Sequence, residues 1–165
     1  MKALNLNRLN IRTPYSVWAV DKQSYGFKTA YGVQYRIGFI ADQTIWQHGA
    51  YEFGIINENR RPSPNDHKLR ETIYAVIEEF FESNPEILLY QCETGDNRQA
   101  MRDRLFLHWF KEYENRGKFV IKVSKITAEG VDNYAAIIVQ STNPHFDQII
   151  QDFNQFVGFF QNKPE

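Results

Sequence analysis

Polar and hydrophobic residues alternate in three segments of the first third of the chain, residues 25–29, 34–39 and 51–56. Alternation with a period of two is typical of strands that bury one face of a sheet. Because the connections between these segments are short, we expect an antiparallel meander. Residues 15–20 are predicted to add an edge strand.

A helix is predicted after the third strand. Ser63 is expected to cap its N-terminus, with Pro64 at the first helical position. Apolar residues then recur at helical spacing as far as Pro85, which prevents the helix from continuing. The next segment, residues 87–91, is apolar without alternation, which is typical of a buried parallel strand.

Two more helices and a hairpin complete the predicted elements. Asp96 and Gln99 form a capping-box pattern at the start of a helix that ends near residue 115. Residues 119–126 and 134–140 are predicted to pair as a hairpin, and an amphipathic helix follows them.

The predicted order is therefore β-β-β-α-β-α-β-β-α, an α/β (α+β) fold with a mixed, mostly antiparallel sheet. The two helical crossovers are expected to be right-handed. This order is similar to the C-terminal three-quarters of the GCN5-related N-acetyltransferase fold, without its first strand and two helices. We expect residues 15–165 to form a single domain and residues 1–14 to form a loosely held arm.

Composition indicates a folded protein with no strong overall charge. The 165 residues are 42% hydrophobic, 15% aromatic and 24% charged, with a formal net charge of −1. This charge does not favour nucleic acid as a partner unless a local basic patch exists. Cys92 is the single cysteine, and the apolar runs are too short for a signal peptide or a membrane span. We therefore expect a cytoplasmic protein that contacts no membrane.

The strand-to-helix junction after residue 91 carries the first candidate site. Arg98 and Arg102 fall in the first two turns of the predicted helix, where the helix dipole disfavours positive charge. They are also four residues apart, where like charges repel. We predict that both point into a concave site with Asp96 and Glu93. The alternative is that neighbouring carboxylates pair with them in a solvated network.

The loop of residues 57–68 is the second candidate site. In an acetyltransferase, a glycine-rich loop at this place binds the pyrophosphate of coenzyme A with its backbone N–H groups. This loop has two prolines, no glycine, and an acidic residue, Asp66. We therefore expect no coenzyme A site of the usual design, no cofactor and no metal. Arg60 and Arg61 could still hold an anion with their side chains.

The segment from Asp96 to Phe110, with Tyr25-Gly26-Phe27-Lys28-Thr29 before it, resembles an uncharacterised bacterial domain-of-unknown-function family. The resemblance covers roughly residues 15–155. It implies a small cytosolic protein and carries no assigned activity. The positions that it marks as hallmarks of the family are Asp96, Arg98, Gln99, Arg102 and Trp109.

Two functions remain open. The first is a non-enzymatic binding or regulatory module that holds a small anionic ligand or a protein, and the alternative is a divergent GCN5-related acyltransferase. Phe159 lies off the apolar stripe of the last helix, so that helix is also predicted to form a homodimer or partner-binding face. The candidate ligand-binding residues are Glu93, Asp96, Arg98, Gln99, Arg102 and Trp109 at the junction, and Arg60 and Arg61 in the loop.

Overall fold

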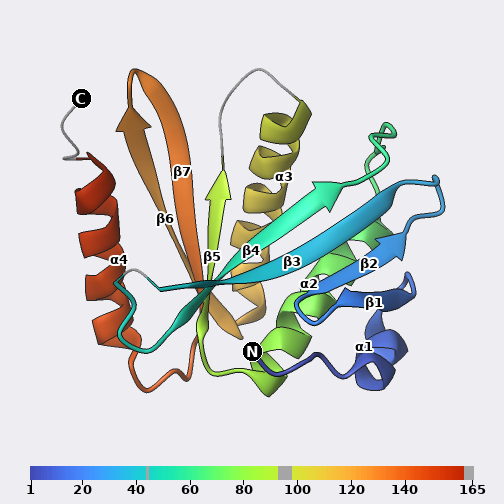
Figure 1. Ribbon diagram of the computed structural model, residues 1–165, viewed down its shortest axis with the longest axis horizontal. Helices are drawn as coiled ribbons and strands as arrows, with labels where there is room; N and C mark the ends of the chain where they lie inside the picture. The colour runs from blue at the N-terminus through green and yellow to red at the C-terminus, as the bar shows by residue number, and fades with distance from the viewer. Residues whose placement is uncertain (44, 93–97, 162–165) are drawn as a thin grey trace. The chain divides into compact units, whose positions relative to one another are not determined.

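The computed structural model describes residues 1–43, 45–92 and 98–161, and it has the predicted mixed α+β fold (Figure 1). Seven strands form one sheet in the order β1-β2-β3-β4-β5-β7-β6. The predicted edge strand is confirmed as β1. The elements are α1 (Leu6–Arg12), β1 (Val17–Asp21), β2 (Ser24–Lys28), β3 (Gln34–Asp42), β4 (Ala50–Asn57), α2 (His67–Ser83), β5 (Ile87–Cys92), α3 (Arg98–Tyr113), the 3-10 turn η1 (Glu114–Arg116), β6 (Phe119–Ala128), β7 (Val131–Gln140) and α4 (Phe146–Gln161).

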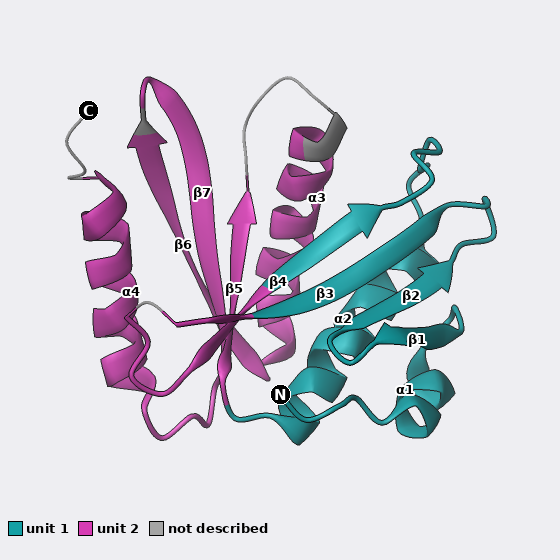
Figure 2. Cartoon of the chain, in the orientation of Figure 1, with its two compact units in different colours: residues 1–40, 53–85 teal, residues 41–52, 86–165 magenta. Residues whose placement is uncertain are grey.

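The chain forms two compact units (Figure 2). Unit 1 consists of residues 1–40 and 53–85. Unit 2 consists of residues 41–52 and 86–165.

The core of unit 1 is aromatic. β1, β2 and β3 form the predicted antiparallel meander, with Trp18 opposite Gly26 and Gly26 opposite Arg36. Burial alternates along β3, where Tyr35, Ile37 and Phe39 are buried, and the ring of Phe39 stacks on that of Phe80 of α2 with 5.1 Å between their centroids. Strand alternation therefore turns one face of this meander towards α2.

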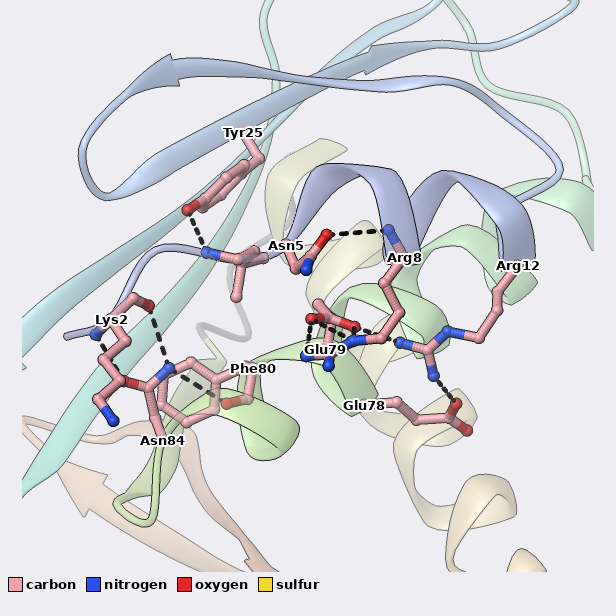
Figure 3. A network of polar contacts seen from close by, with 10 residues as sticks. Lys2, Asn5, Arg8, Arg12, Tyr25, Glu78, Glu79, Phe80 and Asn84 are labelled. Atoms are coloured by element: carbon pink, nitrogen blue, oxygen red, sulfur yellow. Dashed lines mark hydrogen bonds and ion pairs between the residues drawn. The ribbon is translucent and has the colours of Figure 1, made fainter.

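The segment expected to be a loosely held arm contains the helix α1 in unit 1. Asn5 caps it, since its side chain accepts a hydrogen bond from the backbone N–H of Arg8 at 3.0 Å. Arg8 and Arg12 both donate to Glu79 of α2, whose side chain is fully buried (Figure 3). A buried carboxylate needs such partners because its desolvation is costly. The two arginines therefore fasten the N-terminal segment to α2.

Unit 2 has a sheet with aliphatic residues at its centre. β4 pairs with β5 in parallel through Ala50–Glu52 and Ile87–Leu89, while β7 pairs with both β5 and β6 in antiparallel fashion. The predicted hairpin is confirmed as β6–β7. Its two-residue turn places Glu129 and Gly130 at φ 52° and 74°, as expected where two residues close a hairpin.

Helices pack on both faces of the sheet in unit 2. On one face, Phe153 and Phe156 of α4 join a buried cluster with Leu89 and Ile137. On the other, the ring of Tyr90 meets that of Phe110 of α3 edge-on at 5.2 Å. Residues 87–90 of β5 and 135–139 of β7 are accordingly buried.

Candidate functional site

The structure describes part of the site that was predicted at the junction between β5 and α3. Glu93 and Asp96 lie outside the described residues. Arg98 and Gln99 begin α3, but their side chains are also outside the described part. Arg102 is half-buried on α3. The concave site expected around Arg98 and Arg102 therefore stays a prediction.

A buried hydrogen bond joins the two elements of this junction. The hydroxyl group of Tyr90 on β5 donates to Oδ1 of Asp103 on α3 at 2.8 Å. Burial, followed by the charge of Asp103, raises the pKa of Tyr90 far above its ordinary value, and the charge of Arg102 acts in the opposite direction. The Arg102 guanidinium is therefore close enough to act on a pair that fixes the helix to the strand.

Trp109 and Cys92 lie in the core of unit 2. Trp109 is 5% exposed, and its ring centroid lies 5.5 Å from that of Phe106. The thiol group of Cys92 is free of any disulfide and buried. Packing accounts for the position of Trp109, and a ligand-binding role for it stays a prediction.

The second candidate surface is the loop of residues 58–66, which joins β4 to α2 in unit 1. The side-chain amide of Asn59 bonds to the backbone of Gly32 and Gln34, at 2.8 and 3.0 Å. Nδ2 of Asn57 donates to a backbone carbonyl of the same loop at 2.8 Å. Side-chain bonds to the backbone take the place of regular secondary structure here. They give the loop a defined shape.

Arg60 and Arg61 are exposed on this loop. Arg60 adopts a left-handed backbone conformation with φ 53°, which is unfavourable for a residue with a Cβ atom. A Cβ atom at Gly32 would lie 2.7 Å from Nη1 of Arg61, so the glycine leaves room for that guanidinium. Within the described part of the chain, no carboxylate forms an ion pair with Arg60 or Arg61, and the nearby Glu58 pairs with Arg36 at 3.5 Å.

A carboxylate caps the N-terminus of α2. Oδ1 of Asp66 accepts a hydrogen bond from the backbone N–H of Lys68 at 3.0 Å, and Oδ2 accepts one from the Tyr15 hydroxyl at 2.7 Å. The prediction that Ser63 caps this helix was wrong, because Asp66 satisfies the first turn and binds Tyr15 as well. The carboxylate of Asp66 thus occupies the N-terminus of α2, a position at which helices can bind phosphate.

Sequence reasoning missed a third surface, the face of the unit 1 strands that points away from α2. Its residues alternate with the buried core positions, so the period of two was the signal that could have revealed it. Trp18 is 44% exposed there, and Ile40 and Ile56 are 67% and 53% exposed. A Cβ atom added at Gly38 or Gly54 would meet nothing within 4 Å. We call this surface the open face of unit 1.

Within residues 1–43, 45–92 and 98–161, no three His, Cys, Asp or Glu side chains are grouped to hold a metal ion. His48 and His145 stack in unit 2 with 3.6 Å between their ring centroids. None of the described helices has the length and apolar character needed to cross a membrane.

The fold and these surfaces define a mixed α+β protein whose exposed arginines and open face are its distinctive features. A family model covers residues 65–155, more than half of the chain, and the chain belongs to that family, DUF6169, a family of unknown function. No curated protein and no solved structure matches the chain. The matched region begins just before α2 and ends within α4.

Proposed function

We propose that this protein is a non-enzymatic binding module that holds an anionic ligand with Arg60 and Arg61. One observation carries the proposal: two adjacent, exposed guanidinium groups project from a loop of defined shape and have no carboxylate partner within the described residues. Guanidinium groups bind phosphate and carboxylate oxygens in a bidentate manner. A loop already held by hydrogen bonds loses little conformational entropy on binding.

The predicted junction site belongs to the same proposal as a second place of anion contact. Arg102 is half-buried near the Tyr90–Asp103 hydrogen bond, and its positive charge acts to lower the pKa of Tyr90. A partly desolvated guanidinium attracts an anion more strongly than one in bulk water. We expect Arg102→Ala to weaken the binding of an anion, whereas the removal of an arginine that is only solvated would leave anion binding unchanged.

A divergent GCN5-related acyltransferase is the second candidate. The parallel pairing of β4 with β5 around the crossover helix α2 favours it, because the sequence order resembles that fold. The Asp66 cap weighs against it, since the carboxylate would repel the pyrophosphate of coenzyme A at the start of α2. We therefore expect millimolar acetyl-coenzyme A to leave the melting temperature unchanged. A clear rise would favour the acyltransferase.

The binding proposal is tested by titrating the ¹⁵N-labelled chain with inorganic pyrophosphate. We expect the backbone amide signals of Gly32 and of residues 59–61 to shift, and the shifts to disappear in the double variant Arg60→Ala/Arg61→Ala. The matched control is Arg116→Ala, which removes an exposed arginine from unit 2. Amide signals of the loop that do not move, or that move equally in the double variant, would contradict the proposal.

A further inference from the structure

The indole ring of Trp18 lies flat on the open face of unit 1. Trp18 of β1 is directly opposite Gly26 of β2. A Cβ atom at Gly26 would lie 2.8 Å from Nε1 of the indole and 2.9 Å from Cε2, so the ring covers the glycine backbone. Gly26 itself is buried, while Trp18 remains 44% exposed. One face of the indole therefore rests on the strand, and its other face is presented to the solvent.

Basic residues lie on the same face as this ring. Lys28 alternates with the core residues of β2 as Gly26 does, and Arg36 is directly opposite Gly26 on β3. Neighbouring strands are about 4.8 Å apart, so Arg36 starts about 10 Å from Trp18. Arg36 also pairs with Glu58, the first residue of the loop that carries Arg60. A row of an aromatic ring and cationic groups thus extends across the strands towards the loop.

The charge of unit 1 matches an anionic polymer. This unit has ten Lys and Arg residues and seven Asp and Glu residues, although the whole chain has a net charge of −1. Two of the seven acids, Glu78 and Glu79, are held by Arg8 and Arg12 of α1. On the open face and the loop beside it, Arg36 is paired with Glu58, whereas Lys28, Arg60 and Arg61 form no ion pair within the described residues.

We propose that the open face of unit 1 binds single-stranded nucleic acid, with a base stacked on Trp18 and the phosphates following Lys28 and Arg36 to the loop of Arg60 and Arg61. Single-strand binding sites combine aromatic platforms with a basic track along the backbone. The proposal rests on the anion-binding function assigned to the loop and specifies its ligand. An unpaired strand suits an exposed sheet surface, because its bases are free to stack.

An acidic protein segment could pair with the basic residues of the open face, but it could not stack on the indole ring of Trp18. A glutamate-rich peptide has no flat group to place on the exposed face of the indole, whereas every nucleobase has one. The two occupants therefore differ in how strongly their binding depends on Trp18.

The test is the fluorescence anisotropy of a labelled 15-nucleotide oligodeoxythymidylate with the full chain. We expect binding at low salt that weakens as salt rises, because phosphate contacts release counterions. Trp18→Ala is expected to weaken binding by about tenfold or more, and Trp18→Phe to retain most of it. Gly26→Ala is expected to weaken binding too, because the added Cβ displaces the indole. Val131→Ala, which trims a side chain 49% exposed in unit 2, is the control without effect.

The outcomes separate this proposal from the anion-binding function. Arg60→Ala/Arg61→Ala is expected to lower the slope of log affinity against log salt by about two, one for each lost contact. Absence of oligonucleotide binding at low salt, or binding unchanged by Trp18→Ala, overturns the nucleic-acid proposal even if pyrophosphate still shifts the loop signals. Binding that depends on Trp18 but not on the two arginines overturns the loop function instead. If a labelled polyglutamate binds and Trp18→Ala weakens its binding as much as that of the oligonucleotide, the result overturns the nucleic-acid proposal and favours an acidic protein partner.

Discussion

The two units use their sheets differently. In unit 2, α3 packs on one face of the strands and α4 on the other, and the central positions are buried. In unit 1, α2 packs on one face, while Trp18, Ile40 and Ile56 stay exposed on the opposite face. Unit 1 also carries a surplus of basic residues, whereas unit 2 has nine Lys and Arg against thirteen Asp and Glu. A net charge near zero for the whole chain therefore conceals two units of opposite formal net charge.

The two units nevertheless share one kind of polar contact, a buried tyrosine whose hydroxyl group donates a hydrogen bond to an aspartate. In unit 1, Tyr15 donates to Asp66, which also caps α2. In unit 2, Tyr90 donates to Asp103 and lies deeper, so its pKa is raised much further. Burial is the first cause of the raised pKa in both tyrosines, and the aspartate adds to it. The same pair thus serves helix capping in one unit and helix docking in the other.

The largest effect is expected from the aromatic core of unit 1. Phe39→Ala removes a ring that contacts Tyr25, Phe53 and Phe80, and we expect it to lower the free energy of unfolding by about 3–5 kcal/mol. Urea unfolding measures the loss. Ile137→Val, a smaller cavity in unit 2, is expected to cost about 1 kcal/mol. Equal costs for the two variants would remove this distinction between the cores.

The ion pairs of the two units should also differ. Arg8→Ala/Arg12→Ala leaves the fully buried Glu79 without its two partners, so we expect the melting temperature to fall by several degrees. Lys125→Ala breaks the exposed pair with Asp132 in unit 2 and should leave the melting temperature unchanged within error. Thermal unfolding followed by circular dichroism compares them. A double variant as stable as the original chain would mean that α1 adds nothing to unit 1.

Alkaline pH distinguishes the two tyrosines. The raised pKa of Tyr90 contributes stability that is fully present below about pH 10, where a tyrosine of the unfolded chain is still protonated. Above that pH the unfolded chain ionises and the folded protein does not, so the contribution falls by about 1.4 kcal/mol per pH unit. Urea unfolding at pH 9 and pH 11 should show that the free energy of unfolding decreases less between these pH values in Tyr90→Phe than in the original chain. Tyr15→Phe should change the decrease less. Equal decreases in the free energy of unfolding for the original chain and Tyr90→Phe would contradict a contribution of Tyr90 to the loss of stability at alkaline pH.

The smallest effect concerns association through unit 2. Phe159 of α4 is 63% exposed, as expected for a ring off the apolar stripe, and its ring meets that of Phe160 edge-on at 5.4 Å. The homodimer that the sequence suggested remains our proposal. Light scattering at micromolar concentration should give a mass above 19.5 kDa that returns to 19.5 kDa in Phe159→Ser. A monomer in both cases would exclude self-association through this ring.

The sequence predicted the elements whose signals are local. Strand alternation identified the meander, and the glycine of the Glu129–Gly130 turn placed the hairpin. The exposure of Phe159 followed from the helical angle alone. Each of these depends on residues within a few positions of one another, which is why the pattern was sufficient.

Features that depend on distant residues were missed. α1 has a single fully buried side chain, Leu9, and its arginines bond to Glu79, which is 71 and 67 residues away from them in the sequence. The N-terminus of α2 is capped by Asp66 and not by Ser63 as predicted, and Asp66 also accepts a hydrogen bond from Tyr15. Neither partner is visible from local spacing. The same holds for the candidate site, since the sequence predicted an edge strand at residues 15–20 but not that the outer face of Trp18 stays uncovered.

The irregular pairing of β1 has a consequence for how the protein behaves at high concentration. β1 ends the strand order, and its register with β2 shifts between Ala19 and Asp21. A regular edge would offer a template for a strand of another chain, but a bulge interrupts the spacing of its backbone groups. The regular part runs from Val17 to Ala19, well short of the six or seven residues of a steric zipper. We therefore expect this irregularity to hinder fibre growth from the edge strand of unit 1.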